Sequence, residues 1–169
     1  YNIVKKHRGF VDVYSETGNG TIFNLYFPAY QAVEEERDIK EVKSMKFGEG
    51  LILVIDDEKI MQHMAEEILK EVGYTTLCAS DGEVGVELFT SRFNDISAVV
   101  LDMSMPKISG KDTFIRLREI DPTVKVLLVS GFKHGTQVTE MMDLGVRGFL
   151  QKPYTVESLS TAVWETIQK

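Results

Sequence analysis

The chain alternates between two hydrophobic periodicities from residue 51 to residue 169. Short apolar runs of the size of buried strands recur along this region: Leu51–Ile55, Tyr74–Cys78, Ala98–Leu101, Val124–Val129 and Val146–Leu150. Between them, apolar side chains recur at helical spacing. Strands separated by single helices form βαβ units, which build a parallel sheet with helices on both faces. The pattern therefore predicts a doubly wound α/β domain with a five-stranded parallel sheet in the flavodoxin-like order 2-1-3-4-5.

Glycine and aspartate mark the boundaries of the helical stretches. Asp81 precedes Gly82 where a helix should start, because an aspartate side chain accepts hydrogen bonds from the N–H groups of a first turn. Gly73 and Gly145 follow periodic stretches and suit helix ends, since glycine readily adopts the left-handed backbone of a C-cap. The first helix is expected where apolar side chains recur at helical spacing: Ile60, Met64, Ile68 and Val72.

Composition narrows the class of protein. The 169 residues carry a formal net charge of -7, so nucleic acid is not expected as a partner. Cys78 is the single cysteine, which excludes an internal disulfide and favours a cytoplasmic location. No apolar run approaches the length of a membrane span, and we expect no membrane contact by these residues. Because the sequence starts at Tyr1 in mid-pattern, we interpret it as a piece of a longer protein that could be membrane-anchored.

Residues 1–28 have the pattern of a β-hairpin. Two apolar runs, Phe10–Tyr14 and Ile22–Phe27, flank the glycine turn "ETGNGT". An isolated hairpin is marginal in water, so we expect this piece to belong to a larger sheet. Residues 29–50 are rich in charge and irregular in apolar spacing, and we expect them to form a solvated linker before the domain at 51–169.

Polar side chains follow four of the predicted strands. Asp56 and Asp57 come directly after the first strand, and Asp102 ends the third. Ser130 ends the fourth strand, and Lys152 ends the fifth. Each alone has an ordinary role as a helix cap, a turn residue or a surface lysine. Because the carboxyl ends of parallel strands meet at one edge of a sheet, we expect all of them to surround one crevice.

The predicted crevice has the chemistry of a phosphoryl-transfer site. Clustered carboxylates without a neighbouring histidine or cysteine favour a hard divalent cation, and Mg²⁺ is the usual choice where phosphate oxygens complete the coordination. An aspartate beside such a cation can attack a phosphoryl group and form an acyl phosphate. Lys152 and the Ser130 hydroxyl would contact the oxygens of the transferred group. Asp102 stands alone at its strand end, opposite Asp56 and Asp57, and is the better candidate for the nucleophile.

The same motifs carry a resemblance to a known family. Residues 51–169 resemble a receiver domain of two-component signalling in the following motifs: Asp56-Asp57, "DMSMPKISG" from Asp102 to Gly110, Ser130-Gly131 and Lys152-Pro153. The resemblance implies that Asp102 is the phosphoacceptor, that Ser130 and Lys152 contact the phosphoryl group, and that the Lys152-Pro153 bond is cis. It also implies the ligands of Mg²⁺: Asp57, Asp102, the backbone carbonyl of Ser104, and Asp56 acting partly through water.

The N-terminal segment carries a second resemblance. Residues 1–28 resemble the last helix and hairpin of a histidine-kinase ATP-binding domain, and "GNGT" at Gly18 to Thr21 is similar to its final glycine box. The order of kinase tail, linker and receiver resembles a hybrid histidine kinase. The resemblance implies two classes of partner: the phosphohistidine domain of the parent kinase and a histidine phosphotransfer protein. Since most of a nucleotide site is missing here, we expect only aspartyl phosphorylation and dephosphorylation from these residues.

Two other interpretations stay open. A Mg²⁺-dependent phosphatase with an aspartyl nucleophile would use similar carboxylates, but such enzymes carry an Asp-x-Asp-x-Thr type of signature where this chain has Asp56-Asp57-Glu58. A pseudo-receiver would be a binding module that is not phosphorylated, but the residues needed for phosphorylation are present. Turnover of a phosphoester would favour the phosphatase, and failure to take up phosphate would favour the pseudo-receiver.

Overall fold

The computed structural model describes residues 2–28, 45–131 and 136–168. These residues fall into two separate compact units, and each is described by itself. Most of the expected linker, residues 29–44, lies outside the described part of the chain. Among the described helices, none is both long and apolar enough to cross a membrane.

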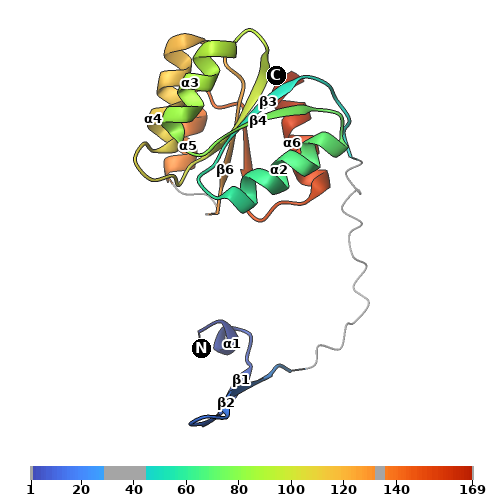
Figure 1. Ribbon diagram of the computed structural model, residues 1–169, viewed down its shortest axis with the longest axis vertical. Coiled ribbons are helices and arrows are strands. Elements are labelled where there is room, and N and C mark those ends of the chain that lie inside the picture. Colours follow the sequence, from blue (N-terminus) through green and yellow to red (C-terminus); the bar gives the residue numbers. More distant parts are fainter. Residues whose placement is uncertain (1, 29–44, 132–135, 169) are drawn as a thin grey trace. The chain divides into compact units, whose positions relative to one another are not determined.

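The first unit is a short helix followed by the predicted hairpin (Figure 1). Helix α1 (Asn2–Lys6) precedes strands β1 (Phe10–Glu16) and β2 (Gly20–Tyr26), which pair antiparallel. Gly18 and Gly20 have positive φ angles of 88° and 90°, which the tight turn between the strands requires. Large apolar side chains are exposed on both strands and just after them: Phe10, Val13, Tyr14, Ile22, Phe23, Leu25, Tyr26 and Phe27.

The second unit is built on a five-stranded parallel sheet. Its strands are β3 (Leu51–Ile55), β4 (Thr75–Ala79), β5 (Ile96–Asp102), β6 (Val126–Ser130) and β7 (Gly148–Gln151). They lie in the order β4-β3-β5-β6-β7, and every neighbouring pair is parallel. Numbered from the start of this unit, the order is 2-1-3-4-5, so the predicted fold is confirmed.

Helices cover both faces of this sheet (Figure 1). The helices of the unit are α2 (Lys59–Glu71), α3 (Gly82–Arg92), α4 (Gly110–Ile120), α5 (Thr136–Asp143) and α6 (Val156–Gln168). Side chains of α2 and α6 pack with one set of alternating strand residues, and side chains of α3, α4 and α5 pack with the other set. Because successive residues of a strand point to opposite faces, buried strands with apolar residues on both faces produce these two core clusters.

The predicted helix boundaries agree with the structure. The Asp81 side chain accepts a hydrogen bond from the N–H of Val84 at 3.0 Å and caps α3. Gly73 and Gly145 follow α2 and α5 with φ angles of 99° and 103°. The helix predicted from the apolar row Ile60, Met64, Ile68 and Val72 is present as α2, but Ile60 is 81% exposed. An i, i+4 row drifts by about 40° per step around a helix of 3.6 residues per turn, so the row leaves the buried face at its first member.

Residues 45–50 pack against the second unit, although they were expected to be solvated linker. The N–H of Gly48 donates to the Val72 carbonyl at 3.0 Å, and the Gly50 carbonyl accepts from the N–H of Thr75 at 2.9 Å. The Nζ atom of Lys46 lies 5.2 Å from the centre of the Trp164 ring, within the range of a cation–π contact. The folded unit therefore begins before its first strand.

Candidate functional site

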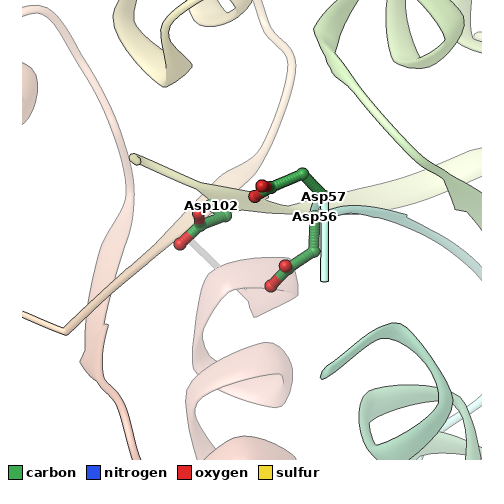
Figure 2. A group of neighbouring side chains, drawn as sticks. All are labelled: Asp56, Asp57 and Asp102. Carbon is green, nitrogen blue, oxygen red and sulfur yellow. The ribbon is translucent and has the colours of Figure 1, made fainter. Parts of the chain in front are cut away.

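The carboxyl edge of the sheet gathers the predicted acidic residues (Figure 2). Asp56 follows β3 and Asp102 is the last residue of β5, and both are buried, with 5% and 4% of their surface exposed. Asp57 is exposed at the same edge. One carboxylate oxygen from each of the three residues lies within 4.8 Å of the others. The structure thus brings together three carboxylates from two neighbouring strands, as the sequence predicts.

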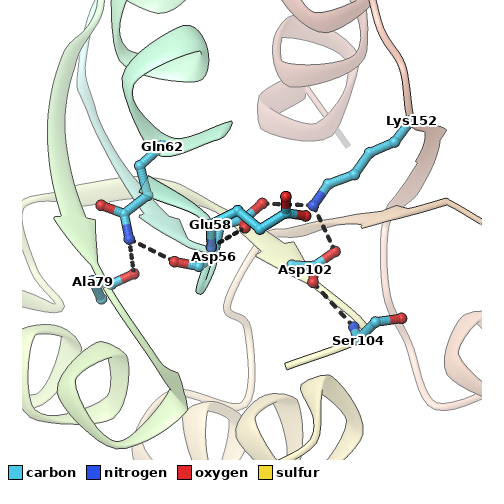
Figure 3. Close-up of polar contacts among 7 residues, drawn as sticks. All are labelled: Asp56, Glu58, Gln62, Ala79, Asp102, Ser104 and Lys152. Carbon is cyan, nitrogen blue, oxygen red and sulfur yellow. Dashed lines mark hydrogen bonds and ion pairs between the residues drawn. The ribbon is translucent and has the colours of Figure 1, made fainter. Parts of the chain in front are cut away.

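Lys152 bridges the two buried carboxylates (Figure 3). Its Nζ atom lies 2.7 Å from Oδ2 of Asp56 and 3.0 Å from Oδ1 of Asp102. The lysine follows β7, and its backbone N–H donates to the carbonyl of Ser130 at 2.8 Å, which ties it to the end of β6. The Lys152-Pro153 peptide bond is cis, as predicted. One ammonium group therefore partly balances the repulsion within the carboxylate cluster.

Backbone N–H groups complete the contacts of the two buried carboxylates. Oδ1 of Asp56 accepts from the N–H of Glu58 at 2.9 Å, and Oδ2 of Asp102 accepts from the N–H of Ser104 at 3.2 Å. Each carboxylate therefore uses one oxygen for a local backbone donor and the other for Lys152. This arrangement fixes both side chains while keeping them at the mouth of the crevice.

Burial and charge act in opposite directions on the ionisable groups of the site. Burial raises the pKa of Asp102 above its usual range, and the hydrogen bond and positive charge of Lys152 only partly counter it. Burial alone would lower the pKa of Lys152, but hydrogen bonds to Asp56 and Asp102 and their charges outweigh it and raise that pKa. The lysine is therefore held in its charged form, while ionised Asp102 is disfavoured.

The loop between β5 and α4 carries Asp102 and Ser104, and close backbone packing holds it. The N–H of Gly110 donates to the Met103 carbonyl at 3.3 Å. A Cβ atom on Gly110 would lie 2.5 Å from the Asp102 carbonyl oxygen, so only glycine fits there. Within the same loop, Lys107 has a left-handed φ of 67°. Its Nζ atom lies 2.9 Å from Oδ2 of Asp81, so the capping aspartate of α3 also contacts this loop.

Sequence reasoning did not identify Gln62, in the first turns of α2. Its Nε2 atom donates to the backbone carbonyls of Asp56 and Ala79 beside the acidic cluster (Figure 3). A helical projection does contain a signal, because Gln62, Ala65 and Leu69 share the i, i+3, i+7 spacing of one helix face. A glutamine on a face whose other members are buried should have polar partners.

Two other predicted site residues are Ser130 and Ser104. Ser130 ends β6 and is fully buried. Ser104 is placed by its N–H contact with Asp102, and its carbonyl stays a predicted ligand. The oxygen donors present suit Mg²⁺, which prefers carboxylates, carbonyls and water. Asp56, Asp57, Asp102 and the Ser104 carbonyl are the groups that would hold it.

Comparison with known protein families identifies the family to which this chain belongs. A profile of the response regulator receiver domain matches residues 52–164, which is well over half of the chain. The chain belongs to this family. Receiver domains act in two-component systems, bind Mg²⁺ at an acidic cluster of this kind, and interact with histidine-kinase phosphodonor domains and phosphotransfer proteins.

Two sensor kinases are among the relatives that resemble this chain. Sensor kinase CckA of Brucella abortus is 30% identical over 179 residues, an alignment that covers 100% of this chain and 19% of that protein. Autoinducer 1 sensor kinase/phosphatase LuxN of Vibrio campbellii is 23% identical over 99% of this chain and 22% of its own length. The chain thus spans about a fifth of the length of these two proteins.

A solved structure resembles the receiver unit. The receiver domain protein from Clostridium thermocellum is 35% identical and superimposes with a TM-score of 0.65 over 70% of this chain and 94% of that chain. The matched 70% is close to the share of the chain that the family profile covers. The likeness therefore concerns the receiver and supports the five-stranded fold described above.

Proposed function

We propose that Asp102 accepts a phosphoryl group from a phosphohistidine and passes it on or returns it. The observation that carries this proposal is the position of Lys152, whose Nζ atom contacts both Asp56 and Asp102. A cation between two buried carboxylates at a crevice can neutralise an incoming phosphoryl oxygen by exchanging one anionic partner for another.

The reaction moves one phosphoryl group between two side chains. A carboxylate oxygen of Asp102 forms a bond to phosphorus, the phosphorus–nitrogen bond to the imidazole breaks, and the imidazole keeps the electron pair and takes up a proton. Lys152 donates to the transferred group, and in this proposal the hydroxyl of Ser130, the last residue of β6, does the same. Mg²⁺, when bound by Asp56, Asp57, Asp102 and the Ser104 carbonyl, supplies positive charge that lets a phosphate dianion approach the carboxylates.

The parent protein proposed for this receiver is a hybrid sensor kinase. The alignments to two sensor kinases cover 100% and 99% of the chain and so extend well beyond the receiver into residues 1–28, which supports a kinase tail before the receiver. In this arrangement residues 1–28 end a histidine-kinase ATP-binding domain, and residues 51–169 form the receiver. The phosphohistidine donor then lies in the parent chain or in a separate phosphotransfer protein, and the receiver works in the cytoplasm.

Intact-mass analysis tests the phosphorylation. Phosphoramidate, whose phosphorus–nitrogen bond resembles that of phosphohistidine, should add one phosphoryl group to the wild type when Mg²⁺ is present. Asp102→Asn keeps the shape of the side chain but removes the nucleophile, and should stay unmodified. Asp143→Asn is the matched control, because Asp143 is an exposed residue of α5 and is not a member of the acidic cluster. The proposal would be contradicted if Asp102→Asn were labelled as much as the wild type, or if a chelator did not reduce labelling of the wild type.

A further inference from the structure

Gln62 ties together the ends of two neighbouring strands. Its Nε2 atom donates to the carbonyl of Asp56 at 2.5 Å and to the carbonyl of Ala79 at 3.1 Å (Figure 3). Asp56 follows β3 and Ala79 is the last residue of β4, so both carbonyls lie where the sheet ladder ends. The N–H of Asp56 also donates to the Ala79 carbonyl, at 3.2 Å. The side-chain amide of Gln62 therefore adds two hydrogen bonds beyond the last backbone pairing of β3 and β4.

The chemistry of the contacts fixes the orientation of this amide. Both partners are carbonyl oxygens, which only accept hydrogen bonds, so the NH₂ group of Gln62 must face them. The backbone N–H of Gln62 donates to the Glu58 carbonyl at 3.0 Å. Gln62 therefore holds the loop at residues 56–58 at both ends, with its side chain on Asp56 and its backbone on Glu58.

This loop carries the acidic pair of the site. The peptide of Asp56 determines where its carboxylate points, and that carboxylate meets the N–H of Glu58 and the Nζ atom of Lys152. Asp57 is exposed, so its direction depends on the backbone on either side of it more than on packing. A group that fixes the Asp56 carbonyl thus acts on both carboxylates without contacting either of them.

We propose that Gln62 is a positioning residue for the acidic pair Asp56-Asp57, and through it for cation binding and phosphorylation at this site. The inference rests on the proposed function for its chemical consequence, but the contacts that carry it do not depend on a bound cation. Groups that hold metal ligands in place typically change metal affinity by about 10-fold to 100-fold when they are removed. The effect of losing the Gln62 amide should fall in the lower part of that range.

Two variants and one control separate positioning from general stability. Gln62→Met has a similar length and no donor, so the two carbonyls lose their partner. Gln62→Glu turns acceptor oxygens toward the same carbonyls and should be the more disruptive of the two. Gln168→Met makes the same chemical change at an exposed position near the end of α6. All three are compared with the wild type in the full 169-residue chain.

The first readout needs no metal. Amide exchange of Glu58, followed by NMR in the presence of a chelator, reports on the hydrogen bond from its N–H to Asp56. We expect exchange at this amide to be about 10-fold faster in Gln62→Met, since a loss of about 1.4 kcal/mol corresponds to a factor of ten. Exchange at buried amides of β6, which is separated from β3 by β5, should change far less.

The second readout uses Mg²⁺ alone and then phosphoramidate. The dissociation constant of Mg²⁺ should rise about 10-fold in Gln62→Met and more in Gln62→Glu, while Gln168→Met matches the wild type. The rate of phosphoryl uptake should fall at low Mg²⁺ and recover to within about threefold of the wild type at saturating Mg²⁺, as expected when a mutation acts on binding more than on the reaction step.

The possible outcomes are distinguishable. If the wild type takes up phosphate and Gln62→Met matches it in Glu58 exchange and Mg²⁺ affinity, Gln62 is not a positioning residue and the proposed function stands. If Glu58 exchange and Mg²⁺ affinity change as expected but the wild type takes up no phosphate, the proposed function is wrong and the positioning role stands. A uniform rise of exchange across the unit would overturn the inference, because it would mean a loss of stability only.

Discussion

The ammonium group of Lys152 lies 2.7 Å from the carboxylate of Asp56, although the two residues are 96 positions apart in the chain. Neither side chain is more than 13% exposed. The same ammonium group is 3.0 Å from Asp102, so a single cation is shared by two buried anions. This shared contact links the end of β7 to the ends of β3 and β5. The charge balance of the two buried carboxylates therefore depends on Lys152.

Removal of the lysine charge should destabilise the receiver in the absence of metal. Lys152→Met keeps the stem of the side chain but leaves Asp56 and Asp102 without their cation. Breaking a buried ion pair on one side costs about 3 kcal/mol or more, because the remaining charges are uncompensated. Urea unfolding in a chelator should show this loss. Added Mg²⁺ should stabilise the variant more than it stabilises the wild type, and equal stabilisation of the two would contradict the charge-balance argument.

The raised pKa of Asp102 predicts a pH-dependent effect of Asp102→Asn. The folded-state pKa lies above the unfolded value of about 3.9, so ionisation of Asp102 opposes folding. The wild type is free of this penalty below the unfolded pKa and gains it as the pH rises through the folded pKa. In a chelator, Asp102→Asn should therefore be more stable than the wild type at neutral pH, and the difference should shrink toward pH 4. A difference that is constant with pH would argue against this origin.

Gly110 should not tolerate a side chain. A Cβ atom there would lie 2.5 Å from the Asp102 carbonyl oxygen and 2.7 Å from the Met103 Cα atom, and backbone atoms cannot rotate away. We expect Gly110→Ala to lose about 1–3 kcal/mol of unfolding free energy and to slow phosphoryl uptake, because the phosphoacceptor loop must shift. Gly131→Ala is the control for stability, since a Cβ atom there would meet no atom within 4 Å. A change of about 0.5 kcal/mol or less is expected for the control.

At position 107, substitution by glycine should give a more stable protein than substitution by alanine, which is the reverse of the order usual in helices. Its φ of 67° is unfavourable for any residue with a Cβ atom, and both Lys107→Gly and Lys107→Ala lose the contact with Asp81. The comparison between the two variants therefore isolates the backbone term. Lys107→Gly should unfold at the higher urea concentration. The same pair of substitutions at exposed Glu67 in α2 should give the opposite order, because alanine favours a helix.

The sequence was sufficient to predict the sheet and its acidic edge, because both depend on local patterns and strand order. Five apolar runs fix the strands, and parallel strands must bring Asp56 and Asp102 to the same edge. The strand boundaries differ slightly from the apolar runs: the run Val124–Val129 corresponds to β6 at Val126–Ser130. Such shifts of one or two residues arise because hydrogen bonding, which decides where a strand ends, is not visible in the apolar pattern.

Contacts between distant side chains could not be predicted in the same way. The position of Lys152 at the edge followed from strand order, but its distances to Asp56 and Asp102 depend on how the end of β7 packs. The role of Gln62 depends on hydrogen bonds to two backbone carbonyls. Every residue has such a carbonyl, so the sequence does not show which of them Gln62 contacts. The pairing of Lys107 with Asp81 joins two loops that are far apart in the sequence and are brought together where α3 packs on α4.

The contacts of residues 45–50 decide where an autonomous receiver can be cut from a longer protein. A fragment that starts at Leu51 would remove the partners of the Val72 carbonyl and of the Thr75 N–H. It would also uncover Tyr74, whose ring packs so closely on Gly48 that it would have to shift to admit a Cβ atom there. Lys46 and its contact with Trp164 would be lost as well. A fragment that is meant to fold on its own should therefore start before residue 45. A fragment that starts at the first strand would lack these contacts and would be less stable.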